Sequence, residues 1–449
     1  MMLLPIVLIA VADSAAIQGV WRTEGYGMVV SIAGPALKAY EETAISCLPS
    51  LSAALRPGTA SGPAEFANSD GQVFDVSAEG KDRVRIHSEG AASDMFARRV
   101  AALPAACAKP ASNTPLANFD IFARTYGDHY ILFDQKKIDW PKVVATARTK
   151  VTGKTTRAEL FEIMKSMVEP LHDAHTFLLD PTTKVRFHGF RTGTDALIKG
   201  GSESLLTVEV PKAFAATQKY LKGPLHSWCE GKVWSGKIDD STAYLRLLSF
   251  SGYSKKGTFR DELAELETAL DAVIVPGLKR LVIDVRINLG GADPLGLAIA
   301  SRLATAPYVA YTKEARSDPV NRAAWTPGQA SRVVPTAKAS FKGPVAILTS
   351  GLTISAGETF TQAMMGRRPA VFRAGEPTQG VFSDVLGRQL PNGFRFGLPN
   401  EVFRAPDGRT FDGPGIPPTH PVPVFGEADR KAGKDRVLEK ALALFAAGR

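Results

Sequence analysis

The 449-residue sequence is poor in cysteine and histidine and has no apolar run long enough to span a bilayer. Its 3 Cys are too few for a disulfide-rich scaffold. A membrane-spanning helix needs about 20 apolar residues, so stable membrane insertion is not expected. The formal charge of +9 is spread thinly. Its densest cluster, 149–157, lacks interleaved aromatic residues, which disfavours a nucleic-acid partner.

The first residues resemble an export signal. An apolar stretch at 3–11 is followed by small residues at 14–16, the pattern of a secretory signal peptide cleaved near Ala16. We therefore expect a periplasmic or secreted protein. In an oxidising compartment Cys47 and Cys107 are the expected disulfide pair, because both would flank one N-terminal module. The alternative is that all three cysteines are buried and unpaired.

The length predicts two or three domains. Short alternating segments after the leader predict a β-sheet or barrel, and the pattern from Leu116 onward predicts helices, one of them capped by Thr155 before Glu159. Strands and helices alternate from about residue 240, which is typical of an α/β layer. The expected divisions are a signal peptide at 1–16, an N-terminal β-rich module at 17–108, a helical subdomain at 109–186, an α/β core at 187–425 and a C-terminal helix at 426–449.

A segment rich in small hydroxyl residues, 348–360, follows a predicted strand. Ser355 would lie at the N-terminus of the next helix, where unpaired backbone N–H groups and the positive end of the helix stabilise a nearby oxyanion. Ala356 and Gly357 leave room for a substrate carbonyl. The alternative for Ser355 is a simple N-cap. Ser350 lies closer to the strand and is expected to be structural.

A second loop, 288–291, ends a buried strand with two glycines. Gly290 and Gly291 can expose backbone N–H groups to a ligand. One of them could supply an oxyanion donor beside the N–H of Ala356, although a plain tight turn is the alternative. Asp284 and Arg286 are expected to form a structural pair that braces the loop.

A third segment, 169–180, contains two of the seven histidines. A serine hydroxyl is a weak nucleophile and needs a base. His175 lies in a polar turn after a predicted helix and could be that base. His172 and His175 could also suggest a metal, but no cysteine or carboxylate cluster completes a known ligand spacing, so no metal is expected.

Five segments together resemble the S41 family of serine peptidases, the tail-specific and tricorn-core-like group. They occur in the family's order and span roughly residues 115–425: 173–176, 284–291, 349–358, 375–383 and 412–418. The resemblance implies an α/β fold with a ClpP/crotonase-like spiral ββα core, a helical subdomain and, outside the family core, an extra N-terminal β-rich module. No cofactor is implied.

The family activates its serine in two ways. One subgroup uses a lysine at the position of Val381, and no lysine occurs between Lys342 and Lys431. The other subgroup uses a histidine, which His175 matches. Its orienting carboxylate would be Asp412, which stands where the family usually has Glu; Glu358 is the fallback acid and His420 a rival base.

The resemblance therefore implies an exported serine peptidase that hydrolyses peptide bonds through an acyl-enzyme. Its substrate would be a protein or peptide. The expected site comprises the triad Ser355, His175 and Asp412, with Gly290, Gly291 and Ala356 around the oxyanion. Two alternatives stay open: a non-catalytic ligand- or peptide-binding protein on the same fold, and a small-molecule esterase or amidase.

Overall fold

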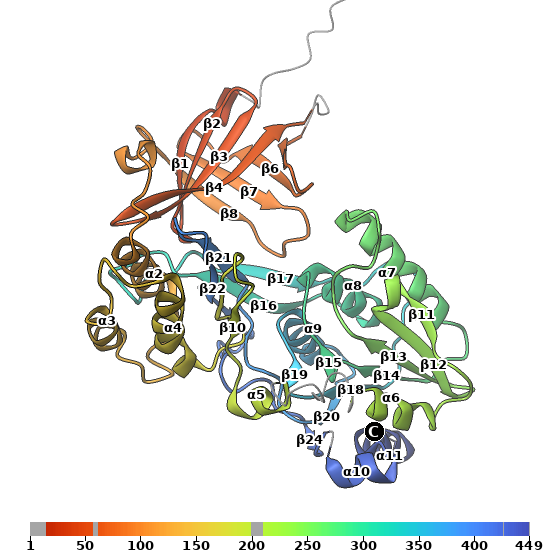
Figure 1. Ribbon diagram of the computed structural model, residues 1–449. Helices are drawn as coiled ribbons and strands as arrows, with labels where there is room; N and C mark the ends of the chain where they lie inside the picture. Colours follow the sequence, from red (N-terminus) through yellow and green to blue (C-terminus); the bar gives the residue numbers. More distant parts are fainter. Residues whose placement is uncertain (1–14, 57–61, 199–209, 425, 449) are drawn as a thin grey trace, which may run out of the picture.

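The computed structural model of the chain (Figure 1) describes residues 15–56, 62–198, 210–424 and 426–448. Nearly all of the expected leader, 1–16, lies outside the described residues. Within those ranges, no helix combines the length and apolarity that crossing a bilayer requires. The chain forms an N-terminal barrel, a helical layer with its own sheet, and a larger sheet covered by helices. Figure 1 shows the barrel and the C-terminal helices at opposite ends of the molecule.

The expected N-terminal β-rich module is an eight-stranded antiparallel barrel. It closes because β1 pairs with both β2 and β8. Trp21 and Phe66 are fully buried inside it. The strands are β1 (Gly19–Thr23), β2 (Met28–Ala33), β3 (Ala36–Thr43), β4 (Ser46–Leu55), β5 (Ala64–Asn68), β6 (Val73–Ala78), β7 (Arg83–Ser88) and β8 (Met95–Val100).

A disulfide joins Cys47 in β4 to Cys107 in the 3-10 turn η1 (Ala105–Ala108), which confirms the expected pair. It ties the segment that leaves the barrel to the barrel wall. Cys229 is buried and unpaired.

Three helices follow: α2 (Pro115–His129), α3 (Trp140–Arg148) and α4 (Arg157–Val168), with the 3-10 turn η2 (Glu169–Leu171) at the end. The expected cap at Thr155 is wrong by one residue. Thr156 caps α4, because its hydroxyl accepts from the Glu159 N–H at 3.3 Å while the Glu159 carboxylate accepts from the Thr156 N–H at 2.8 Å. This reciprocal pair requires a spacing of three residues, which Thr155 does not have.

The helical layer shares its core with a hairpin from much later in the chain. A four-stranded sheet has the order β10-β9-β22-β21. Phe122 and Tyr126 of α2 pack against Phe396 of β22, with ring centroids 5.0 and 5.9 Å apart. The helical layer therefore includes chain from the expected α/β core. The strands are β9 (Phe177–Leu179), β10 (Arg186–His188), β21 (Val385–Gln389) and β22 (Arg395–Pro399).

The largest sheet has seven strands in the order β11-β12-β13-β14-β18-β20-β24, parallel from β13 onward. Ile283 and Ile347 face α7, α8 and α9, whereas their neighbours Val282 and Ala346 face α11. The sheet is therefore buried on both faces, as expected of parallel strands. Its strands are β11 (His226–Trp228), β12 (Val233–Asp239), β13 (Thr242–Leu247), β14 (Arg280–Asp284), β18 (Val345–Thr349), β20 (Phe372–Gly375) and β24 (His420–Pro421).

The remaining elements surround this sheet. The helices are α5 (Thr192–Ile198), α6 (Val210–Gln218), α7 (Phe259–Val273), α8 (Asp293–Leu303) and α9 (Ala356–Met365), with the 3-10 turn η5 (Cys229–Gly231). A three-stranded sheet contains β16 (Tyr308–Ala315), β17 (Gln329–Val333) and β23 (Glu401–Arg404), and a short parallel pair joins β15 (Ile287–Asn288) to β19 (Leu352–Thr353).

The expected single C-terminal helix at 426–449 is wrong. The segment forms two helices, α10 (Glu427–Ala432) and α11 (Arg436–Ala446). Gly433 ends the first in the left-handed conformation, with φ 59°, and the Asp435 carboxylate caps the second by accepting from the Leu438 N–H at 3.0 Å. A glycine stop followed by an aspartate cap breaks the helix.

Candidate active site

The serine and glycine segments meet at one edge of the large sheet. β14 and β18 are parallel neighbours, so their carboxyl ends lie together. The chains that leave them pair again as β15 and β19, with Asn288 opposite Thr353. The Ile354 N–H then donates to the Asn288 carbonyl at 2.9 Å. This ladder brings the loop at 288–291 against the segment that enters α9.

Ser355 occupies a strained turn at the N-terminus of α9. Its φ of 55° and ψ of −121° lie outside the regions that L-residues usually adopt. The side chain is half-buried, and Ser355 and Glu358 have the reciprocal arrangement of a capping box. In this arrangement the backbone N–H of Ser355 donates to Glu358 Oε2 at 3.2 Å. The strained backbone is what distinguishes Ser355 from a plain N-cap.

Glu358 stabilises this turn through further hydrogen bonds. Its buried carboxylate also accepts from the N–H groups of Gly380 at 2.6 Å and Val381 at 2.9 Å. Burial raises its pKa to about 8. Glu358 therefore connects the serine turn to the loop at 375–383.

The two loop glycines differ in what their N–H groups do. Gly290 touches the serine: a Cβ added to it would lie 2.7 Å from the Ser355 Cβ and 3.1 Å from its Oγ. The Gly290 N–H already donates to Asn288 Oδ1 at 3.0 Å. Across the described residues, the N–H groups of Gly291 and Ala356 have no acceptor. Gly291 and Ala356 are therefore better placed than Gly290 to bind an oxyanion.

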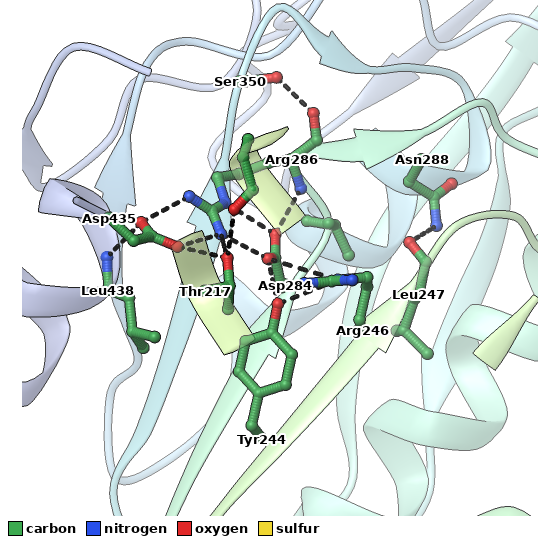
Figure 2. A network of polar contacts seen from close by, with 12 residues as sticks. Thr217, Tyr244, Arg246, Leu247, Asp284, Arg286, Asn288, Ser350, Asp435 and Leu438 are labelled. Carbon is green, nitrogen blue, oxygen red and sulfur yellow. Dashed lines mark hydrogen bonds and ion pairs between the residues drawn. The ribbon is translucent and has the colours of Figure 1, made fainter. Parts of the chain in front are cut away.

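Ser350 is structural, as expected. It is buried, its hydroxyl donates to the Arg286 carbonyl, and it accepts from the Leu352 N–H at 3.0 Å. Figure 2 shows this contact above the buried ion pairs of Arg286 with Asp284 at 2.7 Å and with Asp435 at 2.8 Å. Burial alone would raise the pKa of Asp284, but the Arg286 charge lowers it to about 2. The expected bracing pair is confirmed.

His175 lies in a tight turn after η2. Its backbone N–H donates to Asp173 Oδ1 at 2.9 Å, and Asp173 Oδ2 accepts from the hydroxyl of Tyr130 at 3.0 Å. The next residue back, Ala174, packs against Ile354, the neighbour of Ser355. The histidine and serine turns are therefore side by side. Their side chains are not hydrogen-bonded to each other within the described structure.

The His175 ring is buried, and its Nδ1 has no hydrogen-bond partner in the described part of the chain. Burial lowers the pKa of His175, while the charges of Asp173 and Asp384 and a hydrogen bond to the Ser383 backbone oppose this shift. The imidazole is therefore neutral at neutral pH, the state that a general base needs. His172 is exposed, with a left-handed φ of 45°, and points to no shared metal site.

Asp412 is buried at the start of the segment 412–418. Its Oδ1 accepts from the Phe382 N–H at 3.1 Å and its Oδ2 from the Thr410 hydroxyl at 2.8 Å. Burial raises its pKa to about 7, and the charge of Asp173 adds to the rise. In the described structure Asp412 makes no hydrogen bond to His175. The rival base, His420, lies in the edge strand β24 against Phe372 and Thr419.

Comparison with known proteins finds a family model that matches part of the chain. The profile of Peptidase family S41 matches residues 241–422, which contain Ser355, both glycines and Asp412 but not His175. The chain is 26% identical over 338 residues to carboxyl-terminal-processing peptidase 2, chloroplastic, of Arabidopsis thaliana, an alignment covering 62% of this chain and 63% of that protein. Residues 241–422 of this chain are thus similar to peptidase family S41.

Solved structures show the same fold. A protein of Parabacteroides merdae ATCC 43184, assigned as a peptidase, superposes with a TM-score of 0.60 at 22% identity, covering 74% of this chain and 97% of that one. Mature CPAF complexed with lactacystin superposes with a TM-score of 0.53 at 12% identity, covering 74% and 98%. Both solved structures share the α/β fold of this chain.

Val381 fills the place where the lysine-dependent S41 subgroup would carry its base. Its side chain is buried against Ala174 and Ile354, the residues flanking His175 and Ser355. At the position where the resemblance would put that lysine, this chain therefore has an apolar contact between the two turns.

Sequence reasoning missed a charged cluster near His175. The buried ammonium of Lys313 pairs with Asp384 and, at 3.1 Å, with Glu401. Asp293, at the start of α8, accepts from the hydroxyls of Thr359 at 2.6 Å and Tyr311 at 3.3 Å, and burial raises its pKa to about 7. No sequence signal marks these residues, because they come from separate strands and loops that only the fold brings together.

Proposed function

We propose that this chain is an exported S41-type serine peptidase that hydrolyses protein or peptide substrates through an acyl-enzyme. The observation that carries the proposal is the strained turn that places Ser355 against Gly290 at a helix N-terminus. A non-glycine residue held at a positive φ costs stability unless surrounding contacts fix it, and such strain gathers at functional sites. Ser355 is fixed by Glu358.

In the proposed mechanism, Ser355 Oγ attacks the scissile carbonyl carbon and its proton passes to His175. The N–H groups of Ala356 and Gly291 donate to the resulting oxyanion, with the Gly290 N–H left on Asn288. The C–N bond then breaks, and the leaving amine takes the proton from His175. Water then attacks the acyl carbon while His175 takes its proton. The acyl C–O bond breaks, Ser355 Oγ takes the proton back from His175, and the carboxylic acid product leaves.

We propose Asp412 as the carboxylate that orients His175 and balances its positive charge after proton transfer. Two features support it: it is buried among neutral hydrogen-bond donors, and the Nδ1 of His175 lacks a partner in the described residues. Asp173 is committed to the turn itself by its bonds to the His175 N–H and Tyr130. Glu358 is committed to three backbone N–H groups.

The finer predictions remain part of this proposal. They are the spiral ββα core of ClpP/crotonase type, the divisions at residues 16 and 108, and export by the leader. The disulfide between Cys47 and Cys107 supports an oxidising location.

The test is turnover of a fluorogenic peptide library by the full mature chain. We expect activity in the wild type, and a loss of at least about 10³-fold in Ser355→Ala and His175→Ala. The control is Ser251→Ala, an exposed serine in the loop beside Gly291, which should keep full activity. If Ser355→Ala retained wild-type turnover, the assignment would be wrong. If the wild type cleaved small esters but no peptide, the esterase alternative would replace the peptidase.

A further inference from the structure

The interior of the N-terminal barrel is filled at one end and hollow at the other. The inward-facing side chains of the same strands line both ends. In β6 and β8, Val76 and Ala97 belong to the packed end, whereas their inward neighbours Phe74 and Met95 are only partly buried and line a cavity. The cavity has a volume of about 370 Å³. Eight-stranded barrels have interiors that side chains just fill or that hold one small ligand.

The hollow end is apolar and adaptable. Met28, Leu51, Phe74 and Met95 keep partial exposure there, although their neighbours along the strands are buried. Leaving such side chains facing water costs free energy that an apolar occupant would recover. Methionines suit irregular ligands because their unbranched chains repack readily. The volume lies within the range of about 300–1,000 Å³ that small-molecule sites occupy.

The mouth of the cavity is lined on one side by the later part of the chain, which contributes Lys313, Asp384, Val385, Leu386, Asn400 and Glu401. The barrel is held there by specific contacts. Asp94 and Gln329 exchange two hydrogen bonds of 2.8 and 2.7 Å. The Tyr26 hydroxyl donates to Glu401 Oε1 at 2.7 Å. The cavity is therefore a composite site between two fixed parts.

The charges at the mouth are already paired. Among the described residues that line the cavity, Lys313 is the one cation, and its ammonium is taken by Asp384 and Glu401. The third acid of the lining, Asp94, pairs with Arg85 at 3.3 Å and His87 at 2.9 Å. An anionic ligand head would have no free counter-ion there, and burying an unpaired charge is costly.

One polar group at the mouth lacks a partner. The side-chain Nδ2 of Asn400 is buried and makes no hydrogen bond within the described structure, and Asn400 is 1% exposed. Buried donors are normally satisfied. Because Nδ2 is itself buried, the Asn400 amide must rotate for it to reach a ligand acceptor in the cavity. An uncharged oxygen, such as a hydroxyl or an ester or amide carbonyl, would complete it.

We propose that the barrel cavity binds one small amphiphile, with its alkyl or acyl chain among Met28, Leu51, Phe74 and Met95 and an uncharged oxygen head at Asn400. The site is separate from Ser355 and does not depend on the proposed peptidase activity. It gives the extra N-terminal module a role of its own, as the receptor of a neutral single-chain lipid or a similar molecule.

The test uses the full mature chain and the neutral fluorophore N-phenyl-1-naphthylamine. Three competitors share one chain: 1-decanol, decylamine and decanoate. We expect 1-decanol to displace the fluorophore at one molecule per chain, counted by native mass spectrometry. Decanoate should compete at least about tenfold more weakly, because it buries an anion without a free cation. Decylamine should compete no better than 1-decanol, because its ammonium cannot accept a hydrogen bond from Asn400.

Two variants locate the site. Met95→Trp should fill the hollow and abolish binding, whereas Ile45→Trp, on the exposed turn between β3 and β4, should leave it unchanged. Asn400→Leu, which keeps the cavity apolar, should weaken 1-decanol about tenfold. Thermal unfolding monitors the fold of each variant. The proposal is overturned if the wild type binds none of the three competitors, if Met95→Trp binds like Ile45→Trp, or if blocked apolar peptides displace the fluorophore and 1-decanol does not.

Discussion

Two clusters of buried carboxylates lie near the same sheet edge. One contains an arginine counter-ion, and the other contains only neutral hydrogen-bond donors. Asp284 and Asp435 surround the guanidinium of Arg286, and the pKa of Asp284 is lowered to about 2 (Figure 2). Glu358 and Asp412 face backbone N–H groups and hydroxyls and form no ion pair within the described residues. Burial raises their pKa values to about 8 and about 7.

The comparison separates a brace from a candidate site. A buried carboxylate with a counter-ion stays ionised and is costly to alter, because the partner charge would be left alone. A buried carboxylate without one is tuned towards neutral pH, where it can respond to a proton that moves nearby. The first cluster holds the ends of β14 and β18 in place. The second lies beside Ser355 and His175.

The largest expected effect is on turnover by Asp412→Asn. The amide keeps the acceptor for the Phe382 N–H but cannot balance a charged imidazole, so kcat/KM should fall about 10²–10⁴-fold. The fold should not suffer. Because the folded pKa of Asp412 lies above its unfolded value, its favourable contribution is lost as pH rises through about 7. The variant should therefore be at least as stable as the wild type at pH 8.

Denaturant unfolding at pH 5 and pH 8, beside peptide turnover, measures both quantities. A loss of stability as large as the loss of activity would place Asp412 with the braces.

The paired cluster should respond in the opposite way. Asp284→Ala leaves Arg286 with Asp435 alone and should destabilise the protein by about 3–5 kcal/mol, measured as the shift in urea midpoint. Per folded molecule, labelling of Ser355 should change little. The matched control is Asp318→Ala, an exposed aspartate whose carboxylate accepts only from nearby backbone N–H groups. An Asp284→Ala variant as stable as this control would contradict the bracing role.

The pH profile sharpens the contrast. His175 has a lowered pKa and is neutral at and above pH 6.5. Its titration therefore does not cause the main rise of kcat/KM with pH. Asp412 ionises as pH rises through about 7, so kcat/KM should rise between pH 6 and pH 8. Asp412→Asn should remove this limb and leave a weaker one below pH 6.5. A wild-type limb that persists unchanged in the variant would assign it to another group.

The smallest expected effect comes from Thr410→Val. The Thr410 hydroxyl donates to Asp412 Oδ2 at 2.8 Å and lowers the pKa of this acid. A hydrogen bond to a charged group contributes about 1.5–3 kcal/mol, so its loss should move the limb up by about one to two pH units. Thr268→Val, whose hydroxyl donates to a helix carbonyl, is the control and should leave the profile unchanged. An unmoved limb in Thr410→Val would mean that Asp412 does not control it.

Much of the fold could be predicted from the sequence because it follows local pattern. The helix at 259–273, the strands of the large sheet and the β-rich module all show clear periodicity. The cap at Thr156 differs from the expected Thr155 by one residue of register. The break at Gly433 depends on the left-handed conformation of a single glycine, which the helical pattern around it does not reveal. The pairing of Cys47 with Cys107 followed from their shared module.

The site was only partly predictable. The sequence predicted a glycine of the loop at 288–291 beside the segment at Ser355 and Ala356, and in the structure Gly290 lies against Ser355. The adjacency of β14 and β18 that brings them together was found only in the structure. The sequence could not show that Asn288 occupies the Gly290 N–H, since that bond depends on a turn conformation. Nor could it identify Lys313 and Asp384 near His175, because charged residues on strands usually face solvent.

The most direct measurement is the rate at which a fluorophosphonate labels the purified mature chain, followed by intact mass and peptide mapping. The account predicts one label, on Ser355, with no label in Ser355→Ala and labelling at least about 10²-fold slower in His175→Ala. A wild type that takes no label between pH 5 and pH 9, or an unchanged rate in His175→Ala, would contradict an activated serine at this site.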